Sequence, residues 1–147
     1  MTLTVRFQKL DDRAVAPAYG SASAAGADLY AVADAPITID AGQTVLVHTG
    51  LAVEIPEGFV GLVCARSGLA TKQGLAPANK VGVIDADYRG EVMVALHNHS
   101  GDSRTIESGE RIAQLVLVPY LTAAYEQADS LTDTARGDGG FGSTGTK

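Results

Sequence analysis

Residues 44–64 read TVLVHTGLAVEIPEGFVGLVC, and this stretch decides the fold class of the chain. It holds three short runs rich in Val, Leu and Ile, and Gly50 and Gly58 stand in the gaps between them. The runs cover 44–48, 51–55 and 59–64. Short apolar runs bounded by turn residues are typical of β-strands. The stretch therefore predicts consecutive strands.

The same rhythm continues on both sides of this stretch. Glycines at 42, 50, 58, 74, 82 and 90 fall on a spacing of eight, and further apolar runs lie at 80–84, 91–97 and 111–118. Near the N-terminus, Leu3, Val5 and Phe7 alternate with polar neighbours. Such spacing predicts a sandwich or barrel, and runs that are apolar on both faces indicate cover by a second sheet or another subunit. One short helix is expected at 67–73, with Ser67 as its N-cap.

Composition limits the class of protein. The chain has 147 residues, of which 46% are hydrophobic and 19% charged, so one globular domain is expected. It has no apolar run of the roughly 18 residues that a membrane span needs, and its N-terminus lacks the apolar segment of a secretory signal. A single cysteine, Cys64, suits a reducing compartment. We expect a cytoplasmic protein, or an organellar one after loss of a transit peptide. Its net charge of −6 argues against a nucleic-acid partner.

Two segments carry residues suited to phosphate chemistry. Arg66, Ser67 and Gly68 combine a guanidinium, a hydroxyl and the start of a predicted helix, an arrangement that favours an anion, although an ordinary capped turn looks the same. In GVIDADYRG, residues 82–90, Asp85 directly follows an apolar run. A carboxylate at the edge of a cleft can orient and deprotonate a water. A plain turn is the alternative interpretation.

Two more polar residues stand in apolar surroundings. Asp28 either faces the same cleft or pairs locally, and Gln114 needs a hydrogen-bond partner inside its strand. Other sites are disfavoured. His97 and His99 share a strand face but lack a third zinc ligand, and Cys64 is most simply a core residue. Neither a nucleophile elbow nor a Walker A motif is present.

The last stretch, ARGDGGFGSTGTK at 135–147, has five glycines and little to pack. Such a tail is either frayed or a flexible arm that orders over a ligand. The arm hypothesis is supported by Phe141, because a purely solvated tail has no use for a single aromatic ring.

Together these segments resemble the trimeric dUTPase family, which is marked by five motifs in fixed order. Here they read AGADLYA (25–31), ARSGLA (65–70), GVIDADYRGEV (82–92), RIAQLVL (111–117) and RGDGGFGSTG (136–145). One departure is Ala65, where many members have proline. Each motif alone is a weak signal, but five in order over nearly the whole chain are specific.

The resemblance implies an all-β, jelly-roll-like barrel over 1–135 and a C-terminal arm over 136–147 that closes the active site. It implies a homotrimer with active sites at subunit interfaces. The second and fourth motifs of a site would come from one subunit, the third from a neighbour and the tail from the third. The implied activity is Mg²⁺-assisted hydrolysis of dUTP to dUMP and pyrophosphate by attack of water on the α-phosphorus. That reaction would limit uracil incorporation into DNA and supply dUMP for thymidylate synthesis.

The resemblance also implies residue roles. Asp85 would activate the water, and Asp28 would reach Mg²⁺ through water. Around the phosphates would lie Arg66, Ser67, Gly68 and Gln114, with Arg136, Gly142, Ser143 and Thr144 from the tail. Around the nucleoside would lie Asn79, the backbone of Val83 and Ile84, Tyr88 under the deoxyribose, Met93, and Phe141 stacked on uracil.

Two rival functions stay open. A dCTP deaminase shares the implied fold and the Arg-Ser-Gly turn, but Asp85–Tyr88 and the glycine-rich tail favour the diphosphatase. A non-catalytic nucleotide-binding module is the second alternative, disfavoured because every implied role is filled.

Overall fold

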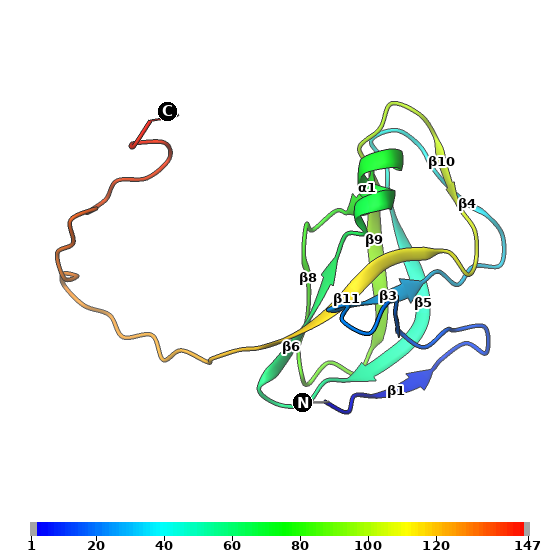
Figure 1. Ribbon diagram of the computed structural model, residues 1–147, viewed down its shortest axis with the longest axis horizontal. Coiled ribbons are helices and arrows are strands. Elements are labelled where there is room, and N and C mark those ends of the chain that lie inside the picture. The colour runs from blue at the N-terminus through cyan, green and yellow to red at the C-terminus, as the bar shows by residue number, and fades with distance from the viewer. Residues whose placement is uncertain (1–2, 146–147) are drawn as a thin grey trace.

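The computed structural model describes residues 3–145, which form eleven strands and one short helix (Figure 1). The elements are β1 (Arg6–Lys9), β2 (Ala18–Tyr19), β3 (Gly26–Tyr30), β4 (Ile37–Ile39), β5 (Thr44–Glu54), β6 (Phe59–Cys64), α1 (Ser67–Gln73), β7 (Leu75–Pro77), β8 (Gly82–Ile84), β9 (Glu91–Asn98), β10 (Arg104–Ile106) and β11 (Arg111–Pro119). The predicted mostly-β chain with one helix is therefore confirmed.

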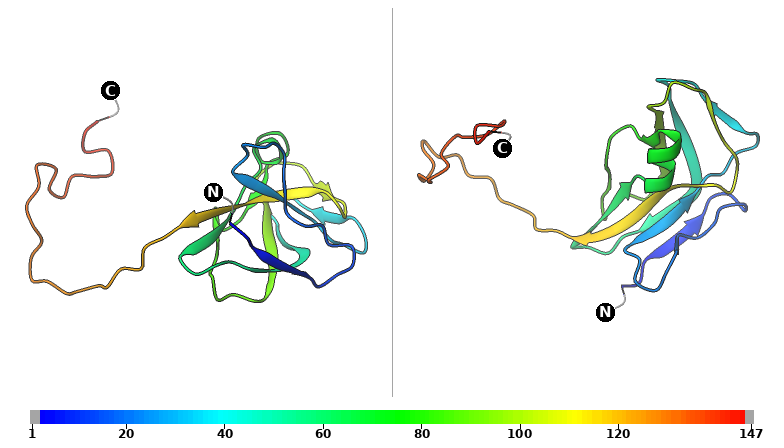
Figure 2. Two further views of the ribbon diagram at one scale, coloured as in Figure 1. Left: turned by 60° about the horizontal axis from the view of Figure 1, so that its bottom comes forward. Right: turned by 45° about the horizontal axis from the view of Figure 1, so that its top comes forward.

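The strands form two large sheets and one small one (Figure 2). One sheet has the order β1-β5-β9-β7, the second has the order β2-β3-β11-β6-β8, and β10 pairs with β4. Both large sheets contribute to one apolar core, with side chains such as Val47, Val94 and Leu96 from the first and Leu29, Val63 and Leu115 from the second. Burial of this shared core stabilises the packing of the sheets, because each presents one apolar face to the other.

The runs 44–48 and 51–55 belong to one strand rather than two. β5 pairs antiparallel with β9, and the register shifts between His48 and Leu51. At this bulge Gly50 has a φ of 66°, which glycine adopts without strain. The glycine spacing predicted a break between the two runs at Gly50, but the residue forms a bulge within one strand rather than a turn between two.

The helix lies where it was predicted, but its cap differs. The N-cap is Arg66, with no side-chain cap hydrogen bond, and Ser67 is the first helical residue. The expectation that Ser67 is the N-cap is therefore wrong, and the Ser67 hydroxyl is not committed to capping. Gly74 ends the helix in the left-handed conformation with φ 70°.

The body of the protein ends at Pro119, and the chain then leaves it (Figure 1). Residues 120–145 contain no helix or strand, and nearly all of them are exposed. The predicted boundary at 135 lies within this segment. Residues 1–2 and 146–147, at the ends of the predicted domain and arm, lie outside the described part. Between residues 3 and 145, no helix has the length and apolarity to cross a membrane.

Candidate functional site

A pocket of about 270 Å³ opens beside β8 and β9. We call it the Tyr88 pocket, and its lining residues are Leu46, Val83, Ile84, Asp85, Tyr88, Glu91 and Met93. Five of these seven were predicted to bind the substrate, so the fold brings most of the predicted nucleoside site together. Two apolar residues in it, Leu46 and Val83, have 51% and 61% of their surface exposed. Exposed apolar side chains that line a concave surface are typical of a binding site.

The backbone of β8 is accessible on one edge. β8 is the last strand of its sheet and pairs only with β6 within residues 3–145, with Ile84 opposite Gly61 and Gly82 opposite Val63. An edge strand keeps one row of N–H and C=O groups free to bind a ligand. Asn79 lies next to this strand, because its amide nitrogen approaches within 3.4 Å of where a Cβ on Gly82 would be.

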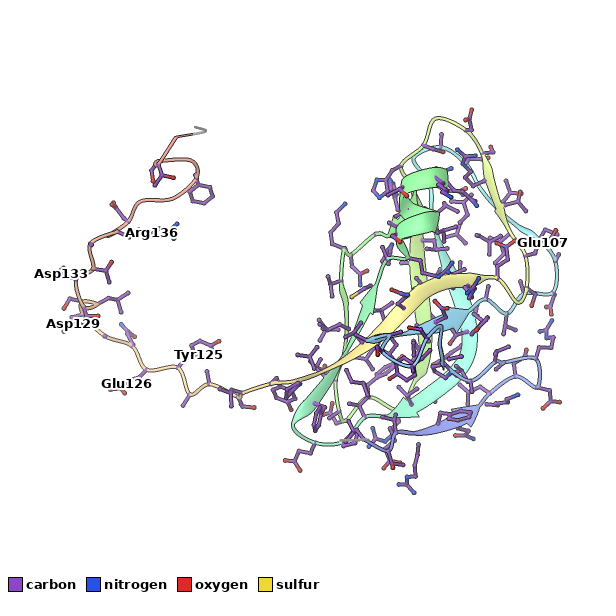
Figure 3. All side chains as sticks on the ribbon, viewed as in Figure 1. Glu107, Tyr125, Glu126, Asp129, Asp133 and Arg136 are labelled. Atoms are coloured by element: carbon purple, nitrogen blue, oxygen red, sulfur yellow. The ribbon has the colours of Figure 1, made fainter. Side chains whose placement is uncertain are left out.

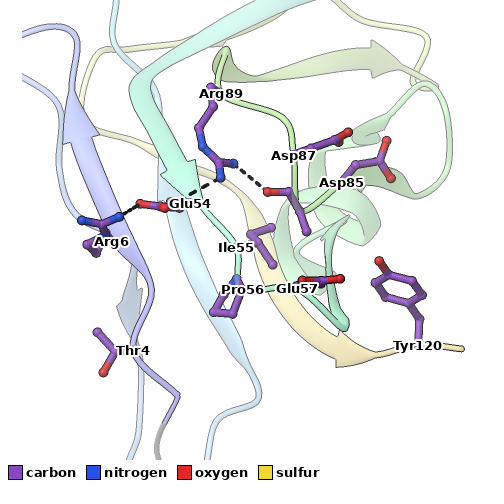
Figure 4. Close-up of a pocket in the computed structure, with 11 residues that line it drawn as sticks. Thr4, Arg6, Glu54, Ile55, Pro56, Glu57, Asp85, Asp87, Arg89 and Tyr120 are labelled. Atoms are coloured by element: carbon purple, nitrogen blue, oxygen red, sulfur yellow. Dashed lines mark hydrogen bonds and ion pairs between the residues drawn. The ribbon is translucent and has the colours of Figure 1, made fainter. Parts of the chain in front are cut away.

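Asp85 begins a tight turn at the rim of the pocket. Its carbonyl accepts a hydrogen bond from the Tyr88 N–H at 3.1 Å. The side chains of Asp85 and Asp87 are exposed and point to the same side (Figure 4). The turn thus presents two carboxylates to solvent beside an apolar pocket.

Asp85 also borders a second hollow of about 730 Å³, which contains an ion-paired network (Figure 4). Glu54 lies 2.6 Å from Arg6 and 3.8 Å from Arg89. The hydrogen bond from Arg6 lowers the pKa of the Glu54 carboxyl. Arg89 also donates to the carbonyls of Ala86 and Tyr88, at 2.6 and 3.0 Å. This arginine therefore braces the Asp85 turn against β5.

A second group of predicted residues lies where β6 leads into α1. We call it the Arg66 cluster, and it consists of Asp28, Arg66, Ser67, Gly68, Arg111 and Gln114. Asp28 is only 5% exposed, and its two oxygens accept from Arg66 Nε at 3.0 Å and Arg111 Nη1 at 3.4 Å. Asp28 thus makes the local pair that the sequence left open. With two guanidiniums around one carboxylate, the cluster keeps net positive charge.

Strand pairing holds the rest of the Arg66 cluster in place. On β11, Gln114 is flanked by Asp28 on β3 and Cys64 on β6. Its side chain lies over Gly26, where an added Cβ would come within 3.1 Å of it. Ser67 and Gly68 are exposed at the start of α1. The end of β6 and the start of α1 thus carry a guanidinium, a hydroxyl and, on the neighbouring strand, an amide, which are residue types that suit an anion.

Arg111 was not among the predicted site residues. Its sequence signal was weak, since it is one of several arginines and opens an apolar strand. Only the pairing of β11 with β3 shows that it shares Asp28 with Arg66, whose Nη1 also donates to the Arg111 carbonyl at 3.4 Å. Long-range pairing of this kind leaves no trace in local sequence.

The Tyr88 pocket and the Arg66 cluster lie at opposite ends of β6. Asp85 continues β8 beyond the pair Ile84–Gly61, whereas Arg66 continues β6 beyond Cys64 in the other direction. At about 3.3 Å per strand residue, the two are on the order of 15 Å apart or more. Within one chain, Asp85 and Arg66 therefore do not meet.

The predicted tail residues lie apart from both groups. In Figure 3, Arg136 lies far from the body, and so do Tyr125, Glu126, Asp129 and Asp133 earlier in the tail. Phe141 is fully exposed. Hydrogen bonds near this residue are local, such as Arg136 Nε to the Gly139 carbonyl at 2.7 Å. One copy of the chain therefore does not place its tail on its own pocket.

The sequence disfavoured a metal site made of protein side chains alone. Within residues 3–145, no group of three or more His, Cys, Asp or Glu side chains is placed to hold a metal ion. His97 and His99 contact each other edge to face, and His97 Nδ1 lies 2.8 Å from Thr44 Oγ1. Cys64 is half-buried beside Gln114.

Known proteins match this chain over nearly its whole length. A dUTPase family model matches residues 12–145. Deoxyuridine 5'-triphosphate nucleotidohydrolases of Desulfitobacterium hafniense and Rickettsia felis are 49% and 46% identical to it, covering 96% and 99% of this chain and 94% and 99% of their own lengths.

Solved structures match it as well. The dUTPase of Staphylococcus bacteriophage 80alpha with dUpNHpp has a TM-score of 0.89 at 30% identity, covering 99% of this chain and 100% of that one. A mutant dUTPase of phage phi11, described with a structural Mg(II) ion, has a TM-score of 0.78 at 26% identity, covering 87% and 98%. Sequence and structure agree with the resemblance that the five motifs suggested, and the chain belongs to the dUTPase family.

Proposed function

We propose that this protein hydrolyses dUTP to dUMP and pyrophosphate, by attack of water on the α-phosphorus with Mg²⁺ bound to the substrate. The observation that carries the proposal is the placement of Asp85. Its carboxylate stands exposed on the rim of a pocket built from Val83, Ile84, Tyr88 and Met93. A nucleoside in that pocket would extend its phosphates past Asp85, where the carboxylate orients and deprotonates a water.

The pocket suits a uracil nucleoside. The free edge of β8 offers backbone N–H and C=O groups to the base, with Asn79 alongside. A cytosine would present the wrong donors and acceptors and leave buried groups unpaired, which discriminates strongly. Tyr88 would lie under the deoxyribose and leave no space for a 2'-hydroxyl. Met93 would help to close the hairpin, formed by the segment that carries Val83 and Ile84, around the base.

The phosphates would bind at the Arg66 cluster of a second subunit. Arg66, Ser67 and Gly68 would hold the chain of phosphates, and Gln114 would bind phosphate or metal-bound water. Because Asp85 and Arg66 are on the order of 15 Å or more apart in one chain, two copies are needed to complete a site. This separation supports active sites shared between subunits.

The third contribution would come from the tail of another copy. Leu121 and Tyr125 are 98% exposed although both are large and apolar, which is costly unless a partner covers them. On the body, Leu3, Phe7, Tyr19 and Leu117 line an apolar groove of about 220 Å³. We therefore propose a jelly-roll-like barrel over 1–135 that assembles as a homotrimer.

In the trimer, the arm 136–147 would cover the nucleotide. Phe141 would stack on uracil, while Arg136, Gly142, Ser143 and Thr144 would bind the β- and γ-phosphates. The glycines make this possible because they let backbone N–H groups approach an anion closely. Gly137, Gly142 and Gly145 already adopt positive φ, which a side chain would hinder.

The donor set fits a Mg²⁺ ion held chiefly by the substrate. Asp28 is the one carboxylate in the Arg66 cluster, and both its oxygens already accept from arginines. A water between Asp28 and the ion is consistent with that arrangement, since Mg²⁺ keeps several of its waters. When bound, the ion would neutralise phosphate charge.

The chemical work of the protein would be positioning and electrostatics. In-line displacement at phosphorus needs an aligned water and charge neutralisation. Proton removal by Asp85 would contribute about 10²–10⁴-fold. We expect the protein to act in the cytoplasm. There the reaction would supply dUMP for thymidylate synthesis and would limit the incorporation of uracil into DNA.

The decisive experiment combines a substrate panel with one substitution. The protein is incubated with dUTP, dCTP, dTTP and UTP, and pyrophosphate and ammonia are measured. We expect pyrophosphate from dUTP alone, whereas ammonia from dCTP would indicate a deaminase. Asp85→Asn should abolish turnover and retain dUTP binding. Asp87→Asn is the matched control, because Asp87 is a second exposed carboxylate two residues away.

Binding with no turnover by the parent protein would instead indicate a non-catalytic nucleotide-binding module. Oligomeric state is a separate test, made by light scattering of the parent protein. A monomer would contradict the shared site, and a trimer is the expected result.

A further inference from the structure

Tyr88 is held at both ends of the residue. Its backbone N–H donates to the Asp85 carbonyl at 3.1 Å, and its hydroxyl donates to the Glu91 carbonyl at 2.8 Å. The ring therefore folds back over the chain that follows it, and Gly90 lies beneath it. A side chain clamped in this way forms a fixed wall of the Tyr88 pocket.

Gly90 leaves the space that the ring occupies. A Cβ atom built on Gly90 would lie 2.5 Å from Tyr88 Oη, 2.6 Å from Cζ and 2.9 Å from Cε2. These three nearest atoms all belong to the far end of one side chain. A side chain at position 90 would therefore have to displace the ring, which can move because it is the far end of a flexible side chain.

The backbone itself does not demand glycine at this position. Gly58 and Gly109 have φ of 83° and 87° and open space around them, so they serve turns. Gly90 is absent from the residues with positive φ. The requirement is steric, and the three nearest atoms that a side chain here would meet all belong to Tyr88.

The Glu91 carbonyl that receives the Tyr88 hydroxyl is itself anchored. The Glu91 carboxylate accepts the Gly50 N–H at 2.8 Å, and its other oxygen lies 2.9 Å from His48 Nδ1. Both partners belong to the bulge of β5, the strand next to β9. The register shift thus lets one side chain on β9 fix the backbone that orients Tyr88.

We propose that Gly90 is a positioning residue that sets sugar specificity, acting through Tyr88 and supported by the Glu91 carbonyl. The inference rests on the proposed function, in which the Tyr88 ring lies under the deoxyribose. With a methyl group at position 90, the ring moves off its place. Contact with deoxyribose is lost and the barrier to a 2'-hydroxyl falls.

The test measures kcat and KM of Gly90→Ala with dUTP and with UTP. We expect kcat/KM for dUTP to fall by about 10-fold or more, mainly through KM, and the preference for dUTP over UTP to fall by about 10–200-fold, the scale of one pocket contact. Gly101→Ala is the matched control, because a Cβ there meets nothing within 4 Å. The control should keep parent values.

A second comparison isolates the route through Tyr88. The same Gly90→Ala change is made in a Tyr88→Ala background, where no ring is left to displace. It should then alter the dUTP preference by less than about twofold, as expected for two residues that act as one unit. An equal loss in both backgrounds would overturn the inference, and so would an unfolded Gly90→Ala by circular dichroism.

The outcomes separate this inference from the proposed function. If the parent protein does not hydrolyse dUTP, the proposed function fails. If the parent prefers dUTP and Gly90→Ala prefers it equally, the proposed function stands and the role of Gly90 is wrong.

Discussion

The body, residues 3–119, and the tail, residues 120–145, use apolar residues in opposite ways. In the body, Leu29 and Leu96 are fully buried, whereas in the tail Leu121 is 98% exposed and Phe141 fully so. The body packs an apolar core within one chain and gains stability from its burial. The tail has nothing in its own chain to bury against. An apolar residue in the tail therefore indicates a partner or a ligand rather than a core.

The two regions also divide the proposed chemistry. The body carries the Tyr88 pocket and the Arg66 cluster, but holds them apart along β6. The tail carries phosphate-binding residue types on a segment without strands or helices. Stability should therefore respond mainly to changes in the body core, and catalysis should respond to changes in the tail as well.

The largest effect is expected from the core. Leu96→Ala removes a fully buried side chain between the two large sheets and should lower the free energy of unfolding by about 2–5 kcal/mol. Urea denaturation measures it. Leu131→Ala is the matched control in the tail, because the same atoms are removed from a side chain that is 88% exposed. Equal losses in the two variants would contradict the comparison.

The next effect concerns the tail as a whole. Deleting residues 136–147 should reduce kcat/KM for dUTP by about 10²–10³-fold, the loss found when preorganised donors to a transition state are removed. The melting temperature should stay unchanged, since residues 136–145 add no core side chain. Steady-state kinetics measures kcat/KM, and calorimetry on the same sample measures the melting temperature. A large fall in melting temperature would show that the tail is part of the folded body.

The ring of Phe141 tests whether the tail contacts the nucleotide base. Phe141→Ala should weaken dUTP binding by about 1–3 kcal/mol, the range measured for stacking of one base on an aromatic side chain. Phe141→Tyr should restore most of it because the ring is kept. Binding of a non-hydrolysable dUTP analogue can be followed by calorimetry. Equal loss of binding in both variants would show that Phe141 does not contribute by stacking on the base.

Sequence reasoning was strongest where structure is local. The β6 run at 59–64 and the helix at 67–73 agree with the structure residue for residue, because apolar runs and breakers act over a few positions. The tail was also evident, since five glycines around Phe141 cannot form a core. Cap chemistry was harder. Ser67 was predicted as the N-cap, but the N-cap is Arg66 and Ser67 is the first residue of the helix.

Long-range contacts account for what the sequence did not show. The bulge at Gly50 depends on a carboxylate from Glu91, which lies 41 positions later in the chain. The pairing of Asp28 with Arg66 and Arg111 depends on three strands meeting in one sheet. Neither has a local pattern. The five motifs predicted the site residues by resemblance, and both their roles and which of them share a chain at each site stay predictions.

The smallest effect is expected from surface ion pairs of the body. Asp11 accepts from Arg13 Nε at 2.9 Å and Nη2 at 2.7 Å, and these hydrogen bonds lower the pKa of Asp11 from 3.8 to about 2. A carboxyl whose folded pKa is lowered stabilises the protein above its unfolded pKa, and this contribution is lost as the pH falls through about 2. The pair is exposed to solvent, so its effect should be slight and should weaken with salt.

Asp11→Asn should therefore lower the melting temperature slightly at about pH 6, and the difference from the parent should vanish near pH 2. Asp12→Asn is the matched control, because Asp12 makes no ion pair within residues 3–145. Melting curves at a series of pH values measure both. A difference for Asp11→Asn that persists unchanged at pH 2 would show that its role is not electrostatic. A difference as large as that of Leu96→Ala would mean that the body depends on its charged surface as much as on its core.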